Sequence, residues 1–195
     1  MKGNLIKMTH GDDPNKLLNA AEKLFYERGY QSVGMDALRA ESKLPLKRIY
    51  TLFPGKTAIA VAMLQRRDER WCSSLAAHVD QESDPKKRIL AIFDWLTDWL
   101  AGEGYRGCAW INAFGELGGT SPEILTEVQN HKTRVRNYVN ELIDNAGRPQ
   151  LAADTVFLLM EGCMVSAGVT GSTEATKQAR EVVAQLLEIQ LIANE

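Results

Sequence analysis

The chain has 195 residues, of which 45% are hydrophobic and 25% are charged, and its formal net charge is -2. This composition argues against disorder and fibrous structure, and 15 glycines and 6 prolines are too few for a collagen-like or linker-rich chain. No apolar run approaches the ~20 residues that a membrane span needs, so we expect a soluble protein with no membrane partner.

The first residues contain two lysines, but no continuous apolar stretch follows them. A signal peptide would need such a stretch, so we interpret residues 1–12 as a flexible N-terminal arm. The expected location is therefore the cytoplasm.

The charge is divided unevenly along the chain. Residues 1–70 hold 13 Lys and Arg against 8 Asp and Glu, a balance of +5, whereas residues 71–195 hold 10 against 17, a balance of -7. Such asymmetry is typical of a polyanion-binding module joined to a second unit.

Paired capping residues and prolines mark three helix starts, at Asp13-Pro14, Asp84-Pro85 and Ser121-Pro122. Gly29 and Gly147 follow the periodic segments that the first and third of these begin, so we expect both glycines to end helices in a left-handed conformation.

Apolar spacing predicts an amphipathic first helix, two short helices between residues 35 and 53, and a longer helix over 56–80. Later helices are predicted near residues 85–101, 106–117, 122–146, 150–169 and 173–193. No segment alternates with the period of a strand. The predicted fold class is therefore all-α, with about nine helices, of which the first three form a small head supported by the fourth.

Metal and cofactor motifs are missing from the sequence. The cysteines at 72, 108 and 163 are far apart, and no histidine lies three or four residues from another histidine or a cysteine. The stretch Gly102-x-Gly104-x-x-Gly107 fits a dinucleotide fingerprint, but it follows a helical pattern and not a strand. We therefore expect no structural metal and no cofactor, and interpret these glycines as a turn between helices.

The two short helices and their brief connection are typical of a helix-turn-helix. The residues Leu18-x-x-Ala21-x-x-Leu24-Phe25-x-x-x-Gly29-Tyr30, Met35-Asp36-x-Leu38, Ile49-Tyr50-x-x-Phe53 and Lys56 resemble the N-terminal signature of TetR-family transcriptional regulators. The resemblance implies a DNA-binding domain at residues 13–55. It also implies a ligand-binding and dimerisation domain at 56–195, with 56–80 as the linking helix.

The resemblance also implies which head residues meet DNA. Major-groove contacts fall to Leu46, Lys47, Arg48 and Thr51, and phosphate contacts to Tyr50 and Lys56. The alternative is that Tyr50 is a core aromatic and that Lys47 and Arg48 lie on a solvated face. The sequence departs from the family pattern, since it has Gly34, Arg39, Lys43 and Lys47 where a hydroxyl residue, a small residue and two glycines are usual.

The body resembles the branch of the family that carries Arg106-Gly107-Cys108-Ala109-Trp110-Ile111-Asn112-Ala113. All four tryptophans lie beyond residue 70, which suits a pocket for a hydrophobic or aromatic effector, although a core stripe would have the same spacing. The candidate ligand-binding residues are Trp71, Trp95, Trp99, Trp110, Asn112, Phe114 and Met160.

Cys108 carries two alternative interpretations. It is a redox switch if Arg106 and a nearby helix start lower the pKa of its thiol, and otherwise it is a buried, inert thiol.

The last two helices each present an apolar face, one with Val156, Leu159, Met160, Cys163 and Ala167, the other with Val182, Val183, Leu186, Leu187 and Ile189. Small residues at 162, 167 and 168 favour close approach. The family resemblance implies a homodimer through these helices and hence a roughly palindromic double-stranded DNA operator.

The predicted function is a ligand-responsive transcriptional regulator, a repressor that leaves its operator when a small effector binds. Two alternatives remain: a small all-helical enzyme, for which no catalytic motif is present, and a ligand-binding scaffold without DNA binding.

Overall fold

The computed structural model of the chain describes residues 12–189, so all but the last residue of the predicted arm at 1–12, and the last six residues of the chain, lie outside the described part. Between residues 12 and 189 the chain forms nine α-helices and no strand, as the periodicity predicted. The helices are α1 (Asp13–Arg28), α2 (Met35–Ser42), α3 (Leu46–Leu52), α4 (Lys56–Val79), α5 (Pro85–Ala101), α6 (Ala109–Leu117), α7 (Pro122–Asn145), α8 (Gln150–Thr170) and α9 (Glu174–Glu188).

Two of the three predicted capping residues cap their helices. The Asp84 carboxylate accepts a hydrogen bond from the Lys87 backbone N–H at 3.0 Å, and the Ser121 hydroxyl accepts one from the Ile124 N–H at 3.4 Å. The prediction for Asp13 was wrong, because this residue is the first of α1 and its N-cap is Asp12. Gly29 and Gly147 both have positive φ, +86° and +66°, but Gly29 ends α1 with an extended ψ of 157° and not in the predicted left-handed helical conformation.

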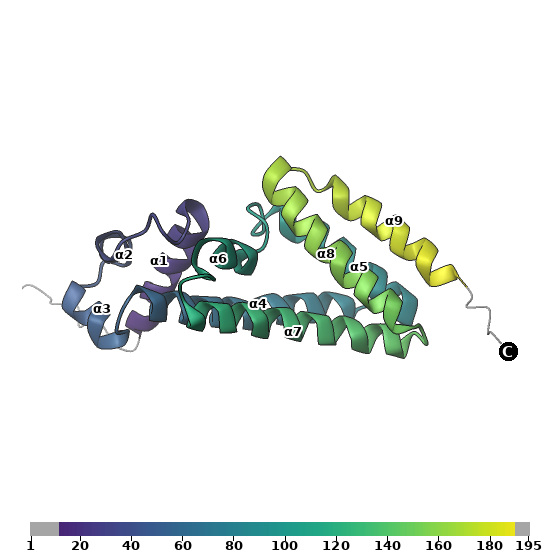
Figure 1. Cartoon of the computed structure of the whole chain (residues 1–195), viewed down its shortest axis with the longest axis horizontal. Helices are drawn as coiled ribbons and strands as arrows, with labels where there is room; N and C mark the ends of the chain where they lie inside the picture. The colour runs from purple at the N-terminus through teal and green to yellow at the C-terminus, as the bar shows by residue number, and fades with distance from the viewer. Residues whose placement is uncertain (1–11, 190–195) are drawn as a thin grey trace, which may run out of the picture.

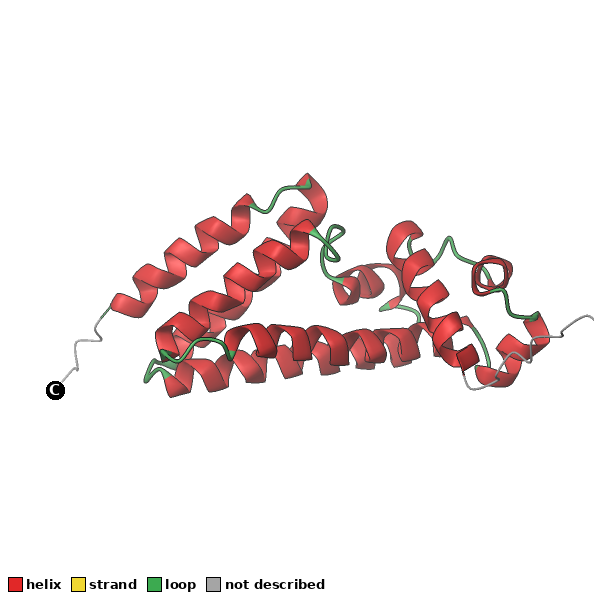
Figure 2. Ribbon diagram, turned by 180° about the vertical axis from the view of Figure 1, so that it is seen from behind, coloured by secondary structure: helices red, strands yellow, loops and turns green. Residues whose placement is uncertain are grey.

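The molecule is elongated (Figure 1). Helices α1, α2 and α3 gather at one end, the long helices α4 and α7 lie side by side along the length, and α5, α8 and α9 form the other end (Figures 1 and 2). The short α6 packs on α7 and lies beside α1. The body thus reaches the head by two routes, along α4 and through α6, whereas the sequence indicated only the first.

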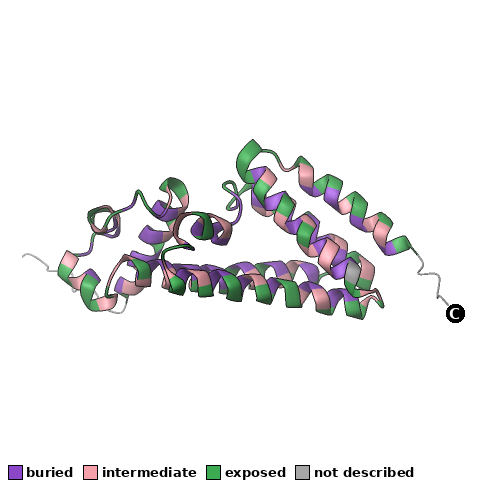
Figure 3. Ribbon diagram, in the orientation of Figure 1, coloured by how far each residue is buried: buried purple, intermediate pink, exposed green. Residues whose placement is uncertain are grey.

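The buried apolar side chains form one continuous core that follows the inner faces of the helices (Figure 3). In the head, Leu17, Leu38 and Ile49 are fully buried, and so are Ile59 and Leu64 of α4. Each such side chain contributes roughly 1.5–3 kcal/mol relative to an exposed one. The three head helices therefore depend on α4 for their stability, as expected from their small size.

Helix α8 is more apolar than the sequence analysis expected. Residues Ala152–Thr170 are long and apolar enough to cross a membrane by length and composition alone. However, α8 packs against α5, α7 and α9, and 39% of this stretch is buried within the described part of the chain.

The apolar face predicted for dimerisation on α8 lies inside the protomer, because four of its residues are buried and Leu159 is half-buried against the core; the four are Val156, Met160, Cys163 and Ala167. Gly168 also makes its close approach within the chain, since a Cβ there would lie 2.9 Å from the Arg106 carbonyl oxygen. Among the side chains that the structure describes, the large exposed apolar ones are Leu158, Val165 and Val169 on α8, Val182 on α9, and Ile189 directly after α9.

Candidate functional site

The second helix of the helix-turn-helix, α3, presents a narrow polar face. Ile49 is buried against the head, while Lys47, Tyr50 and Thr51, spaced as neighbours on one helix face, are exposed. The Thr51 hydroxyl donates to the Lys47 carbonyl at 2.9 Å. Leu46 is half-buried at the start of the helix. The solvent-exposed surface of α3 is therefore formed mainly by Lys47, Tyr50 and Thr51.

Arg48 is held by the head itself. Its Nε donates to Asp13 Oδ2 at 2.9 Å, and the Asp13 side chain is only 6% exposed. This ion pair joins α3 to the first turn of α1, so the Arg48 guanidinium already has a structural partner.

Lys56, at the start of α4, also has intramolecular partners. Its ammonium donates to the carbonyl oxygens of Tyr30 and Val33, at 2.8 and 3.1 Å. These carbonyls lie in the loop between α1 and α2, so Lys56 fastens this loop to the linking helix.

The turn between α2 and α3 has an unusual backbone. Lys43 ends α2 at φ 57°, ψ 25°, and it is the one non-glycine residue with positive φ between residues 12 and 189. A left-handed conformation costs a side-chain-bearing residue about 1–3 kcal/mol, which explains why glycine suits this position.

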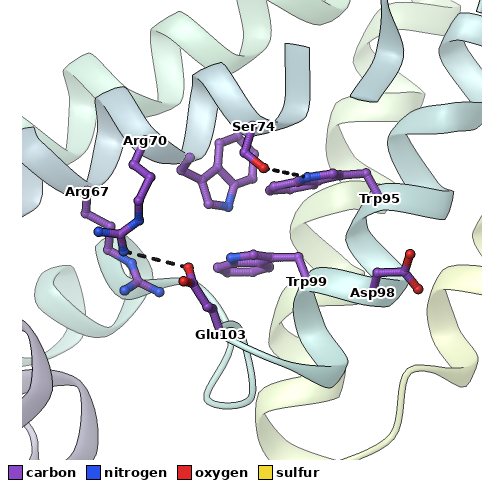
Figure 4. Close-up of a pocket in the computed structure, with 8 residues that line it drawn as sticks. Arg67, Arg70, Ser74, Trp95, Asp98, Trp99 and Glu103 are labelled. Atoms are coloured by element: carbon purple, nitrogen blue, oxygen red, sulfur yellow. Dashed lines mark hydrogen bonds and ion pairs between the residues drawn. The ribbon is translucent and has the colours of Figure 1, made fainter. Parts of the chain in front are cut away.

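A cavity of about 360 Å³ opens between α4 and α5, with the loop after α5 at its rim (Figure 4). Its lining residues are Arg67, Arg70, Trp71, Ser74, Trp95, Asp98, Trp99 and Glu103. This volume is at the lower end of the range for small-molecule sites.

Three tryptophans form the aromatic part of this cavity. Trp71 meets Trp95 and Trp99 edge to face, with ring centroids 4.9 and 6.0 Å apart, while Trp95 and Trp99 stack at 5.7 Å. The Trp95 indole N–H donates to the Ser74 hydroxyl at 3.1 Å. Of the seven ligand-binding candidates, these three are brought together.

The other four candidates lie elsewhere. Trp110 is buried and stacks on His131 with centroids 3.5 Å apart, and Met160 is fully buried in the core. Asn112 donates to the Arg106 carbonyl at 3.1 Å, and Phe114 is 54% exposed on α6. None of these four lines the cavity between α4 and α5.

The polar end of the cavity, which the sequence analysis missed, is connected to the head. Glu22 of α1 accepts from Arg66 at 3.1 Å, from Arg67 at 2.6 Å and, closer still, from Arg70. Although burial opposes it, hydrogen bonds and charge from Arg70 and Arg67 lower the pKa of Glu22. Arg67 and Arg70 sit one α-helical turn apart, a spacing that could have indicated a shared basic face.

The loop between α5 and α6 also contacts α1. The Tyr26 hydroxyl donates to the Gly107 carbonyl at 2.7 Å and accepts from the Arg106 N–H at 3.2 Å. Burial raises the pKa of Tyr26 to about 12, so the phenol is a neutral donor. The Arg67 guanidinium lies 4.5 Å over the Tyr26 ring. The cavity and the head thus share Arg67 directly.

A second polar cluster lies beneath Trp110. The ring Nδ1 of His131 is 2.5 Å from Asp68 Oδ1, and the Lys132 ammonium is 3.4 Å from the Cys108 sulfur. Burial by itself lowers the pKa of His131, but the hydrogen bond to Asp68 outweighs it and the pKa is raised. Burial likewise raises the pKa of the Cys108 thiol, but Lys132 and His131 outweigh it and the pKa is lowered. Cys108 is 3% exposed, so it combines a buried position with a cationic surrounding.

One trio among the described residues could hold a metal ion, with ligand atoms of Asp68, Cys72 and His131 within 4.8 Å of one another. The Asp68 carboxylate already accepts from both other members and pairs with Arg134 at 2.6 Å. Burial and the nearby Asp68 charge raise the pKa of Cys72 to about 12, which opposes the thiolate form that binds metals. The trio fits a hydrogen-bonded cluster better than a metal site.

Comparison with known proteins gives consistent results. Residues 17–63 match the family model for bacterial regulatory proteins of the tetR family. The chain is 23% identical over 184 residues to the HTH-type transcriptional repressor NemR of Escherichia coli strain K12, covering 89% of this chain and 92% of that one. The HTH-type transcriptional regulator LmrA of Bacillus subtilis is 31% identical over 91 residues, covering 46% of this chain and 48% of that one.

The fold is also similar to that of solved structures. The crystal structure of SCO4454, a TetR-family transcriptional regulator from Streptomyces coelicolor, matches with a TM-score of 0.84 at 24% identity. That match covers 92% of this chain and 90% of the other.

Proposed function

Since the chain belongs to the TetR family of transcriptional regulators, we propose that it is a homodimeric repressor that leaves its operator when an effector enters the tryptophan-lined cavity. Members of this family bind DNA as dimers and respond to small molecules. The observation that carries this proposal is that Arg67 and Arg70 line the cavity and also hold Glu22 of α1. The effector site and the DNA-binding head therefore share two side chains.

Release from DNA follows from this shared contact. A ligand that moves either arginine or the loop at residues 102–108 changes the contacts of Glu22 and Tyr26 with the body. Because these contacts set the position of α1, they also set the position of α3 through the Arg48–Asp13 pair. An effector that prefers the displaced arrangement shifts the population away from the DNA-binding one.

The DNA-reading residues follow from exposure on α3. We assign base-edge contacts to Lys47 and Thr51 and a phosphate contact to Tyr50, with Leu46 packing at the groove edge. Arg48 and Lys56, which the family resemblance placed on DNA, act by holding the head together. Two such helices one turn of duplex apart, about 34 Å, would read a roughly palindromic operator.

The dimer interface is assigned to the exposed apolar residues of α8 and α9. Leu158 lies two turns before Val165 on α8 and Val169 one turn after it, while Val182 lies on α9 and Ile189 directly follows α9. A four-helix interface with the partner's α8 and α9 would remove these side chains from water. The apolar composition of α8 is then explained by contacts on two sides and requires no membrane, which agrees with a cytoplasmic regulator.

A mobility-shift assay with the DNA next to the protein's own coding sequence tests the proposal. We expect a salt-sensitive, sequence-selective shift that Thr51→Ala and Lys47→Ala weaken. The absence of any selective shift at about 50 mM salt would favour the scaffold alternative over a regulator.

The coupling between cavity and head has its own test. Glu22→Gln removes the charge that Arg67 and Arg70 hold, so we expect weaker operator binding with an unchanged dimer. Glu41→Gln is the matched control, because Glu41 pairs only with the exposed Lys23 within the part of the chain that the structure describes. Equal losses in both variants would contradict the proposed coupling.

A further inference from the structure

The cavity between α4 and α5 has two chemically distinct ends. Trp95 and Trp99 come from α5, and Arg67 and Arg70 come from α4 on the other side of Glu103 (Figure 4). Asp98 lies on the far side of Trp99 from the arginines (Figure 4). One end therefore offers flat aromatic surfaces, and the other offers cationic hydrogen-bond donors.

Several of these donors are buried without an acceptor. Arg67 is 4% exposed, and its Nε and Nη2 have no hydrogen-bond partner among residues 12–189. The indole N–H of Trp71, also 4% exposed, lacks a partner in the same range. Buried donors of this kind cost free energy unless an acceptor is supplied, and a ligand can supply it.

The cavity already contains one exposed carboxylate, that of Glu103, close to the arginine end where a ligand acceptor would bind. Glu103 lies between the arginine guanidiniums and the Trp99 ring (Figure 4), with a carboxylate oxygen 3.7 Å from Arg70 Nη2. Its side chain is 65% exposed and sits on the loop between Gly102 and Gly104. An ion pair this exposed and this long is weak, so a better-placed carboxylate can replace it.

From this geometry we propose that the effector is an aromatic carboxylate whose ring packs on the tryptophans and whose carboxylate replaces that of Glu103 beside Arg70 and reaches Arg67. A guanidinium binds a carboxylate through paired, charge-assisted hydrogen bonds, which a neutral amide cannot match. A two-ring acid is well within the volume of about 360 Å³. This inference names the effector class for the proposed regulatory site and rests on that proposal.

The probe is 2-naphthoate, compared with its neutral isostere 2-naphthamide, with binding followed by calorimetry and by tryptophan fluorescence of the dimeric protein without DNA. We expect the acid to bind at least about tenfold more tightly than the amide. Equal affinity for the two probes, or tighter binding of the amide, would overturn the proposal.

Two pairs of variants locate the anion site. Arg70→Gln should abolish the preference for the acid, whereas Arg66→Gln, which removes another partner of Glu22 outside the cavity lining, should keep it. Glu103→Gln should raise the affinity for 2-naphthoate by about two- to fivefold, because the competing carboxylate is gone. The control is Asp98→Asn, which removes a charge from the cavity lining beyond Trp99 and should change the affinity less.

The gain in Glu103→Gln cannot arise from misfolding, so an unchanged affinity there would overturn the proposal even if Arg70→Gln is unstable. These measurements need no operator. A protein that prefers the acid but binds no DNA would contradict the proposed function alone, and a protein that binds DNA but shows no preference would contradict this inference alone.

Discussion

Arg48 and Asp13 form an ion pair, with Arg48 Nε 2.9 Å from a buried Asp13 oxygen, that ties α3, the second helix of the helix-turn-helix, to the start of α1. The arginine most obviously suited to reading guanine is therefore already engaged inside the head.

Arg48→Ala should consequently act on stability more than on sequence preference. Loss of the ion pair removes a charge-assisted hydrogen bond to a buried carboxylate, so we expect the free energy of unfolding to fall by about 1–3 kcal/mol. Urea denaturation measures this change. Lys47→Ala is the comparison: it should keep the stability and weaken operator binding more than random-duplex binding, by ~1–3 kcal/mol if Lys47 contacts a base. If Arg48→Ala instead kept the stability and lost sequence preference, while Lys47→Ala lost stability, Arg48 would be the residue that contacts a base.

The dimer assignment predicts a change of assembly. Val169→Glu, at a side chain that is 82% exposed in the protomer, should place a charge inside the four-helix interface and yield monomers in sedimentation velocity. Phe114→Glu is the matched control, since Phe114 is also an exposed apolar residue but lies on α6. A Val169→Glu protein that remains dimeric would show that the partner packs elsewhere.

The Asp68–His131 pair predicts a pH-dependent stability. The pKa of His131 is raised above 6.5 in the folded protein. The contribution of this shift to the free energy of unfolding is therefore complete below about pH 6.5 and is lost as the pH rises through the folded-state pKa. The pKa of Asp68 is lowered from 3.8, so its contribution is lost only as the pH falls through the lower folded value.

Unfolding free energies between about pH 5.5 and 9 should therefore decline towards alkaline pH in the wild-type protein and decline less in Asp68→Asn. His78→Gln serves as the control, because His78 lies outside this cluster. A parallel decline in Asp68→Asn would rule out the pair as its source.

Gly104→Ala should disturb the aromatic wall of the cavity. A Cβ at this position would lie 2.5 Å from the Trp99 ring, which must move and lose its stacking on Trp95. We expect an altered near-ultraviolet circular dichroism spectrum and a destabilisation of about 1–3 kcal/mol. Gly102→Ala meets its nearest atom at 3.6 Å and should leave the spectrum unchanged. The assigned packing would be incorrect if the two variants gave the same spectrum.

Lys132→Met tests the surroundings of Cys108. Removal of the ammonium 3.4 Å from the sulfur should raise the pKa of the thiol, so the rate of alkylation by iodoacetamide should rise at higher pH than in the wild-type protein. Lys177→Met, at an exposed lysine that pairs with Glu174, is the control. An unshifted rate profile would show that Lys132 does not stabilise the thiolate.

The helices could be predicted closely because their signals are local. Proline after a capping residue marks Asp84 and Ser121, and glycine marks the ends at Gly29 and Gly147. Helix α6 begins later than predicted, at Ala109, because Gly107 has φ +74° and still belongs to the loop.

The candidate sites could be predicted only in part, because they depend on contacts between distant segments. The spacing of Trp95 and Trp99 indicated a shared face, but nothing local shows that Trp110 turns towards His131 instead. Likewise, the sequence does not reveal that Glu22 neutralises arginines 44 to 48 positions away, or that Arg48 is paired with Asp13. Helical periodicity identifies which face is apolar, but it cannot say which neighbour covers that face.

The contact of Gly107 with α8 has a consequence for how the protein transmits a signal. A Cβ on Gly107 would lie 2.5 Å from the Met164 carbonyl oxygen, so the backbone of this loop rests directly on the helix that carries Val165 and Val169. The same loop holds Glu103 at the cavity and the Tyr26 hydroxyl of α1. In the proposed dimer, this one short loop thus contacts the effector, the head and the helix that faces the second subunit. Binding of an effector to one cavity would therefore change the effector affinity of the other protomer.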